Sequence, residues 1–162
     1  MAGNASATLV LESDGVVLDT NTGLEWEQNA NHGPFTWLGA ENYATTLALD
    51  GGGWHLALFG ELQALYSDLI AAGVCSGPDC SGSIGGFTDI QDIYWSGTEV
   101  IPGSFARLFH FESGGMATGN ETLQLLAWAV RPGDVDAAAP EPATLALLGL
   151  GLAGLGFSRR KQ

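Results

Sequence analysis

Basic residues are scarce in this 162-residue chain, which has 5 lysines and arginines against 18 aspartates and glutamates. Three of the five stand at the C-terminus, so residues 1–142 set Arg107 and Arg131 against all 18 acidic residues, a net charge of −16. No lysine precedes Lys161. Because such a surface repels phosphates, sulfates and anionic headgroups, the sequence excludes nucleic acid, acidic polysaccharides and anionic membrane faces as partners of this region.

Catalytic motifs are also missing. The chain contains no G-x-S-x-G nucleophile elbow and no H-E-x-x-H zinc motif, and no cysteine neighbours a histidine in the sequence. The histidines are scattered at positions 32, 55 and 110, and His110 lies between two phenylalanines, as a core or half-exposed strand residue would. We therefore expect no enzymatic activity, no catalytic residue and no cofactor.

A long hydrophobic run occurs at the end of the chain. The tail has three parts in order: the motif Pro140-Glu141-Pro142, an apolar run over residues 143–157, and the basic cluster Arg159, Arg160 and Lys161. As a helix the apolar run would span roughly 22 Å, which is shorter than the roughly 30 Å core of a bilayer and suits transient insertion. The basic cluster would stay cytoplasmic, so that residues before Pro140 lie outside.

These three parts, at the extreme C-terminus, resemble the PEP-CTERM sorting signal. The resemblance implies export in a Gram-negative bacterium that makes extracellular polysaccharide, and processing by an exosortase. It also implies passage through the inner membrane and a final place in the cell envelope or the extracellular biofilm matrix. The sorting signal would occupy residues 140–162, after a linker at residues 133–139.

Export also requires an N-terminal signal peptide, and the sequence does not begin with one. Residues 1–7 lack both a charged start and an apolar core of about 7–15 residues. We expect either that the chain begins after the cleavage point or that the gene start is truncated.

Cysteine occurs twice, as Cys75 and Cys80 around the turn sequence Ser-Gly-Pro-Asp. A zinc site would need further ligands, which three scattered histidines do not supply, and a thioredoxin-like motif has two intervening residues rather than four. Paired cysteines in an exported protein are ordinarily oxidised. We therefore expect Cys75 and Cys80 to form a disulfide that closes a short loop.

Residues 8–132 show the pattern of a single α+β domain. Short apolar or β-branched runs between turn signals predict strands at residues 8–12, 16–18, 24–26, 93–98, 105–111 and 123–131. Helical spacing predicts two helices, the first running from its cap at Thr36 to Ala48 and the second carrying Leu62, Leu65, Tyr66, Leu69 and Ile70 on one face. The last strand is almost wholly apolar and should lie centrally.

The domain resembles the Lcl C-terminal-like family in the order of its short motifs: Val17-Leu-Asp-Thr-Asn-Thr-Gly-Leu-Glu-Trp26, Gly53-Trp-His-Leu56, Tyr94-Trp-Ser96 and Ala129-Val-Arg131. It departs where the family has Trp-Arg-Leu-Pro, here Trp54-His-Leu-Ala57, and where Gly97 replaces a serine. The resemblance implies a C-type lectin-like fold, with two helices, a long loop region and a terminal strand beside the first. The family is associated with adhesion and sulfated glycans, a ligand class that two arginines among 18 acidic residues cannot hold.

Acidic and amide side chains in two segments are candidates for a ligand or calcium site. Asp89 and Asp92 lie just before a predicted strand, where their carboxylates could bind calcium. Asn120 and Glu121 weakly echo the calcium-binding triplets of C-type lectins. The simpler interpretation of all four is a solvated loop rim, and the question of a metal stays open.

The sequence thus predicts a non-catalytic, exported envelope or matrix protein whose domain binds a glycan or a surface in adhesion. The glycan would be neutral or calcium-bridged and bound by loops at residues 77–92, 102–104 and 114–120. Two alternatives stay open. One is a secreted glycan-acting hydrolase that uses Asp89, Asp92 or Glu112 as acid and base. The other is a purely structural matrix component.

The five tryptophans bear on this choice, because an exposed indole could stack on a sugar. Trp37, Trp54, Trp95 and Trp128 fit core positions, on a helix face or in apolar strands. Trp26 ends a predicted strand, and the pattern does not decide its side. We therefore expect no tryptophan platform built from the first four.

Overall fold

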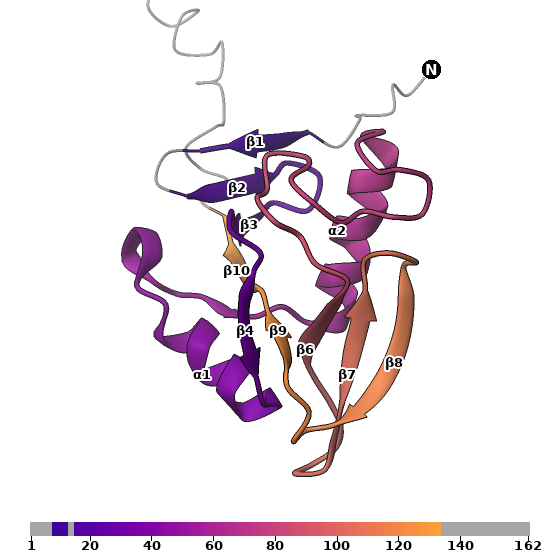
Figure 1. The fold of residues 1–162 in the computed structure, drawn as a ribbon. Coiled ribbons are helices and arrows are strands. Elements are labelled where there is room, and N and C mark those ends of the chain that lie inside the picture. Colours follow the sequence, from indigo (N-terminus) through magenta and orange to yellow (C-terminus); the bar gives the residue numbers. More distant parts are fainter. Residues whose placement is uncertain (1–7, 13–14, 134–162) are drawn as a thin grey trace, which may run out of the picture.

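The computed structural model describes residues 8–12 and 15–133, and these form an α+β domain of two five-stranded sheets and two helices (Figure 1). The first sheet has the strand order β1 (Leu9–Leu11), β2 (Val16–Asp19), β3 (Leu24–Glu27), β10 (Ala129–Pro132) and β5 (His55–Leu56). The second has the order β4 (His32–Phe35), β9 (Leu125–Ala127), β6 (Ile93–Ile101), β7 (Phe105–His110) and β8 (Gly115–Asn120). All neighbours are antiparallel except the parallel pair β6 and β9.

The beginning and the end of the domain lie together in the first sheet. Strand β10 pairs with β3, so that Val130 lies opposite Trp26 and Arg131 opposite Glu25. The amide of Gly133 donates a 2.8 Å hydrogen bond to the Gly23 carbonyl. The chain therefore leaves the domain beside its opening hairpin, at the top of Figure 1, and the β6–β7 turn lies at the opposite end.

Both predicted helices form. Helix α1 (Trp37–Thr46) begins at the predicted cap, where the Thr36 hydroxyl accepts a hydrogen bond from the Gly39 amide. It ends two residues before the predicted end at Ala48, and a short 3-10 turn, η1 (Leu49–Gly51), follows. Helix α2 (Phe59–Ala71) buries Leu62, Leu65 and Leu69. The prediction for Ile70 was wrong: it is 40% exposed, because it falls at the edge of the apolar stripe, and Asp68 is buried instead.

The structure corrects the strand predictions in two ways. The apolar run 123–131 is not one strand but two, β9 and β10, which lie in different sheets on either side of Trp128. Both are interior strands, as its apolar composition indicated. Strands β4, β5 and β8 were not predicted, because segments such as Gly-Met-Ala-Thr-Gly-Asn have no alternating apolar pattern and pair only through the tertiary fold.

Aromatic side chains fill two adjoining cores. One surrounds Trp128, which lies 5.4 Å from Trp26 and 5.0 Å from Phe87 between ring centroids. The other contains Trp37, Trp54 and Trp95. All five tryptophans are buried, Trp26 included, so none forms a platform on the surface.

Among the described residues, no helix is long and apolar enough to cross a membrane. The apolar run at residues 143–157, for which a helix was expected, lies outside them.

Candidate functional site

Asp89 is held inside its own loop. Its carboxylate accepts hydrogen bonds of 2.6 Å from the amide groups of Asn31 and Gln91, and its backbone N–H donates to the Ser83 hydroxyl at 3.1 Å. Its backbone has φ = 58°, in the left-handed region where Asp is tolerated. These contacts give the carboxylate a structural use in fixing the turn before β6.

Asp92 joins the start of β6 to the end of β7. One carboxylate oxygen lies 3.2 Å from Nδ1 of His110, and the other accepts a 3.2 Å hydrogen bond from the Glu112 amide. Asp92 and Asp89 thus each bind a separate set of partners. The third proposed acid, Glu112, contributes its backbone here and is exposed.

Asn120 and Glu121 shape the turn that follows β8. The Asn120 side-chain oxygen accepts from the Thr122 amide at 3.0 Å and from its hydroxyl at 2.7 Å, and the Glu121 carbonyl accepts from the Trp37 amide at 3.0 Å. Desolvation raises the pKa of Glu41, with further contributions from the charges of Glu99 and Glu121.

No group of three His, Cys, Asp or Glu residues in the described ranges is arranged to hold a metal ion.

The predicted binding face is divided between the two ends of the second sheet. His110 pairs with Ile93 and Gly115 at one end of β7, whereas Phe105 pairs with Ile101 and Asn120 at the other. Six strand residues separate these ends by about 17 Å. Residues 77–92 and 114 lie near the His110 end, and residues 102–104 and 120 lie at the Phe105 end, so the prediction that these loops form one surface was wrong.

Cys75 and Cys80 form a disulfide bond, with an S–S distance of 2.03 Å. The Tyr66 hydroxyl donates to the Pro78 carbonyl at 2.7 Å, and the Cys80 amide donates to the Phe111 carbonyl at 2.9 Å. The small loop is therefore fastened to helix α2 and to the residue after β7.

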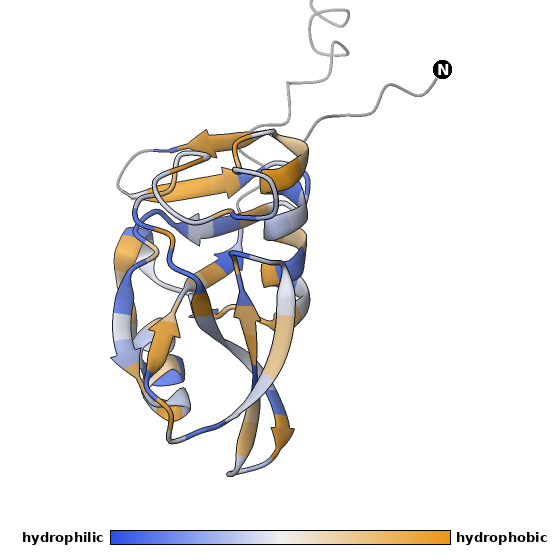
Figure 2. Cartoon of the chain, turned by 45° about the vertical axis from the view of Figure 1, so that its right-hand side comes forward, coloured by the Kyte–Doolittle hydropathy of each residue, from blue (hydrophilic) through white to orange (hydrophobic). Residues whose placement is uncertain are grey.

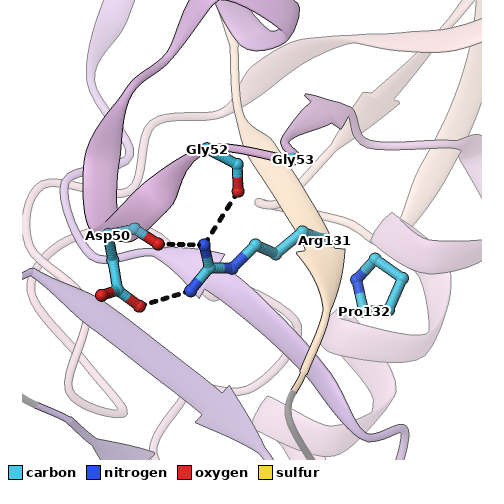
Figure 3. A pocket seen from close by; sticks show the side chains of 5 residues that line it. All are labelled: Asp50, Gly52, Gly53, Arg131 and Pro132. Carbon is cyan, nitrogen blue, oxygen red and sulfur yellow. Dashed lines mark hydrogen bonds and ion pairs between the residues drawn. The ribbon is translucent and has the colours of Figure 1, made fainter.

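Arg131 lines a hollow of about 390 Å³ together with Asp50, Gly52, Gly53 and Pro132 (Figure 3). Its guanidinium donates to the carbonyls of Asp50 at 2.6 Å and Gly52 at 2.9 Å, and also to the Asp50 carboxylate.

On its other side, the Arg131 guanidinium donates to Glu25 at 2.7 Å, and it lies 4.6 Å from the ring centroid of Trp54. These partners use the donors of the guanidinium internally. The hollow is therefore the outer side of a structural ion-pair network that fastens the glycine-rich turn to β10. The Arg131 guanidinium that lines it already donates to groups of the protein.

A second buried network contains Glu27, which is only 5% exposed. Its Oε1 accepts a 2.6 Å hydrogen bond from the Tyr43 hydroxyl and lies 2.9 Å from Nε2 of His32, whose ring stacks on that of Tyr43. Desolvation raises the pKa of Glu27 to about 7 and lowers the pKa of His32.

The sequence analysis missed both networks. Glu25 and Glu27 alternate with Trp26, a pattern that ordinarily puts acids on a solvated face, but here α1 and η1 lie over that face of the sheet. The scarcity of arginine was the available signal. A domain with only Arg107 and Arg131 is expected to pair them with acidic side chains, and Arg131 does pair with Glu25.

The expected sorting residues, Pro140, Glu141, Pro142, Arg159, Arg160 and Lys161, lie outside the described residues. A model of the PEP-CTERM protein-sorting motif matches residues 138–161. The motif marks the protein as an exosortase-processed extracellular surface protein.

The folded part has a family as well. A search of curated proteins found no match. The model of the Lcl C-terminal domain matches residues 15–131, which include strands β2 to β9, all but the last residue of β10, both helices and both buried networks. The chain therefore belongs to the Lcl C-terminal domain family.

Proposed function

We propose that this protein is a non-catalytic module that binds neutral glycans of the cell envelope or extracellular matrix. The observation that carries the proposal is the joining of an Lcl C-terminal domain to a PEP-CTERM motif in one chain. The motif marks the domain for the extracellular surface, where polysaccharide is the ligand we expect, and the domain offers few cationic groups that could hold an anionic ligand instead. Adhesion within the matrix is the role we assign to it.

A C-type lectin-like fold is part of the proposal. It is supported by the pairing of the terminal strand β10 with β3 and by the two helices packed on largely antiparallel sheets. It is also supported by the long loop from Ala72 to Asp92, which the disulfide and the contacts of Asp89 hold in place.

The ligand we propose is uncharged. A sulfated chain needs clustered cations, and Arg131 is enclosed by Glu25 and Asp50. The −16 balance of residues 1–142 would repel such a chain further. We also favour direct contact over a calcium bridge, because Asp89, Asp92 and Asn120 each accept hydrogen bonds within the domain or face a histidine.

The rival proposal, a glycan hydrolase, requires two carboxyl groups placed on either side of a scissile bond. The internal partners of Asp89 and Asp92 argue against it. Incubation with neutral polysaccharides should release no new reducing ends. Release that disappears in Asp92→Asn would establish the hydrolase instead.

A glycan array tests the binding proposal. The processed protein should bind uncharged glycans weakly, with the same pattern in calcium and in a chelator, and display of many copies would raise the avidity. Submicromolar, salt-sensitive binding to heparin-like chains would contradict the proposal. Retention of no glycan at all would favour the structural matrix component.

A further inference from the structure

Helix α2 leaves one end of the second sheet uncovered. The helix begins at Phe59 and packs over Phe109, whereas the sheet continues past it to the β6–β7 turn at the bottom of Figure 1. On this uncovered part Ile101 is 53% and Phe105 38% exposed, and Met116, which pairs with Phe109 beside the start of α2, is 53% exposed. Figure 2 colours the lower end of β6 as hydrophobic. Contiguous exposed apolar side chains of this kind are typical of interaction surfaces.

The register of the strands places these side chains together. Ile101 lies directly opposite Phe105, and Phe105 and Arg107, two residues apart on β7, point to the same face. Arg107 extends over the Phe59 ring, 5.4 Å from its centroid, and donates to the sulfur of Met116. Ile101, Phe105, Arg107 and Met116 therefore form one surface, which we call the β7 platform.

Arg107 differs from Arg131 in having no acidic partner. No carboxylate of residues 8–12 or 15–133 lies within ion-pair distance of it, although acidic residues dominate this domain. Its contacts are with an aromatic ring and a thioether, which leave guanidinium donors free for a ligand. The exposed Thr118, opposite Arg107 on β8, adds a hydroxyl to the same face.

We propose that the β7 platform is the glycan-binding site, in which an uncharged sugar ring stacks its C–H face on Phe105 and its hydroxyls accept hydrogen bonds from Arg107. The inference rests on the proposed function and names its site. The charges of the domain and of the platform argue against a charged occupant. A polyanion or a second copy of the chain would meet the strong negative charge of the domain, and a cationic group seated on the platform would lie against the guanidinium of Arg107, with no carboxylate of the described residues paired there.

Affinity gel electrophoresis of the processed protein tests the site, because its negative charge gives it a high mobility that a gel-bound polysaccharide would retard. The probes are three uncharged polysaccharides, dextran, galactomannan and hydroxyethylcellulose, with polygalacturonate as the acidic comparison. At least one neutral probe should retard the unaltered protein. Phe105→Leu, which keeps an apolar side chain but loses the ring, and Arg107→Gln should each raise the Kd about tenfold or more.

The control is Leu38→Ala, on α1, which removes an even more exposed apolar side chain outside the platform and should leave the Kd unchanged. All variants should stay folded, with unfolding temperatures within a few degrees of that of the unaltered protein. Full retardation of the folded Phe105→Leu and Arg107→Gln variants would overturn the site while leaving the proposed function intact. Stronger retention on polygalacturonate than on any neutral probe would overturn the uncharged ligand. A lack of retardation of the unaltered protein by every probe would overturn the proposed function itself.

Discussion

Tyr43 donates a hydrogen bond of 2.6 Å to Oε1 of Glu27, and this bond joins α1 to the buried face of β3. Because burial raises the pKa of Glu27 to about 7, the carboxyl is divided between its protonated and ionised forms at neutral pH. Desolvation, followed by the hydrogen bond and charge of Glu27, raises the pKa of Tyr43, so the phenol remains a donor. The contact between helix and sheet therefore depends on the protonation of one acid.

The Glu27 carboxyl should make the stability of the protein depend on pH. Its pKa is higher in the folded protein than the ordinary value of 4.5, so the stability it contributes is fully present below about pH 4.5 and is lost as the pH rises through about 7. The difference in unfolding free energy between the unaltered protein and Glu27→Gln should therefore fall by on the order of 3 kcal/mol between pH 4.5 and pH 8. Urea unfolding at several pH values measures it.

His32 contributes in the opposite direction. Burial lowers its pKa below 6.5, so its contribution to stability is present above that pH and is lost as the pH falls through the folded pKa. Because His32 lies 2.9 Å from Glu27, the same comparison is repeated in a His32→Gln background, where the titration of His32 is absent. A difference that stays constant across the pH range would contradict the buried, titrating Glu27.

Tyr43→Phe should destabilise the protein more at pH 8 than at pH 5. At high pH the variant leaves an ionised, buried carboxylate without its phenol donor, at a cost of about 1–3 kcal/mol. Tyr66→Phe is the matched control, because it loses a bond to the neutral Pro78 carbonyl and should show the same loss at both pH values. Equal pH profiles for the two variants would argue against an ionisable partner for Tyr43.

Arg131→Gln should destabilise the protein by about 3–5 kcal/mol, because it leaves Glu25 buried with its cationic partner removed. Arg107→Gln, the matched control on the β7 platform, should cost less than about 1 kcal/mol, since no acid depends on it. Chemical unfolding of both variants gives the comparison. Equal losses would show that the Arg131 network is not a principal support of the fold.

Because Cys75 and Cys80 are bonded to each other, protein recovered from outside the cell should have no titratable thiol when it is denatured. Replacing Cys75 and Cys80 by serine should lower the free energy of unfolding by about 2 kcal/mol without preventing folding, because the closed loop is short. Two free thiols per chain in the unaltered protein would contradict the bond.

The sequence predicted the parts of the fold that depend on strong local patterns. The Thr36 cap and the Leu62, Leu65 and Leu69 face follow from side-chain spacing alone, whereas the division of the apolar run 123–131 into two strands of different sheets does not. Strand β8 could not be predicted in this way, because its glycines and polar residues pair through the register of β7.

The candidate site residues likewise divide into what local sequence patterns indicate and what only the tertiary fold determines. Asp89, Asp92, Asn120 and Glu121 were candidates because of their chemistry, but Asp89 and Asp92 have partners distant in the sequence, Asn31 and His110, which no local pattern indicates. The β7 platform was missed because exposure of Phe105 depends on where α2 begins, which no local pattern encodes.

The central claim is that an exosortase processes this chain to a surface protein. The most direct test measures the mature mass and the location of the chain in a host that has an exosortase. The unaltered protein should be shortened at its C-terminus and recovered from the envelope or the medium. Glu141→Ala, and deletion of residues 159–161, should each leave the protein unprocessed or misrouted. The same mature mass and the same location for both variants and the unaltered protein would contradict the sorting function of the tail.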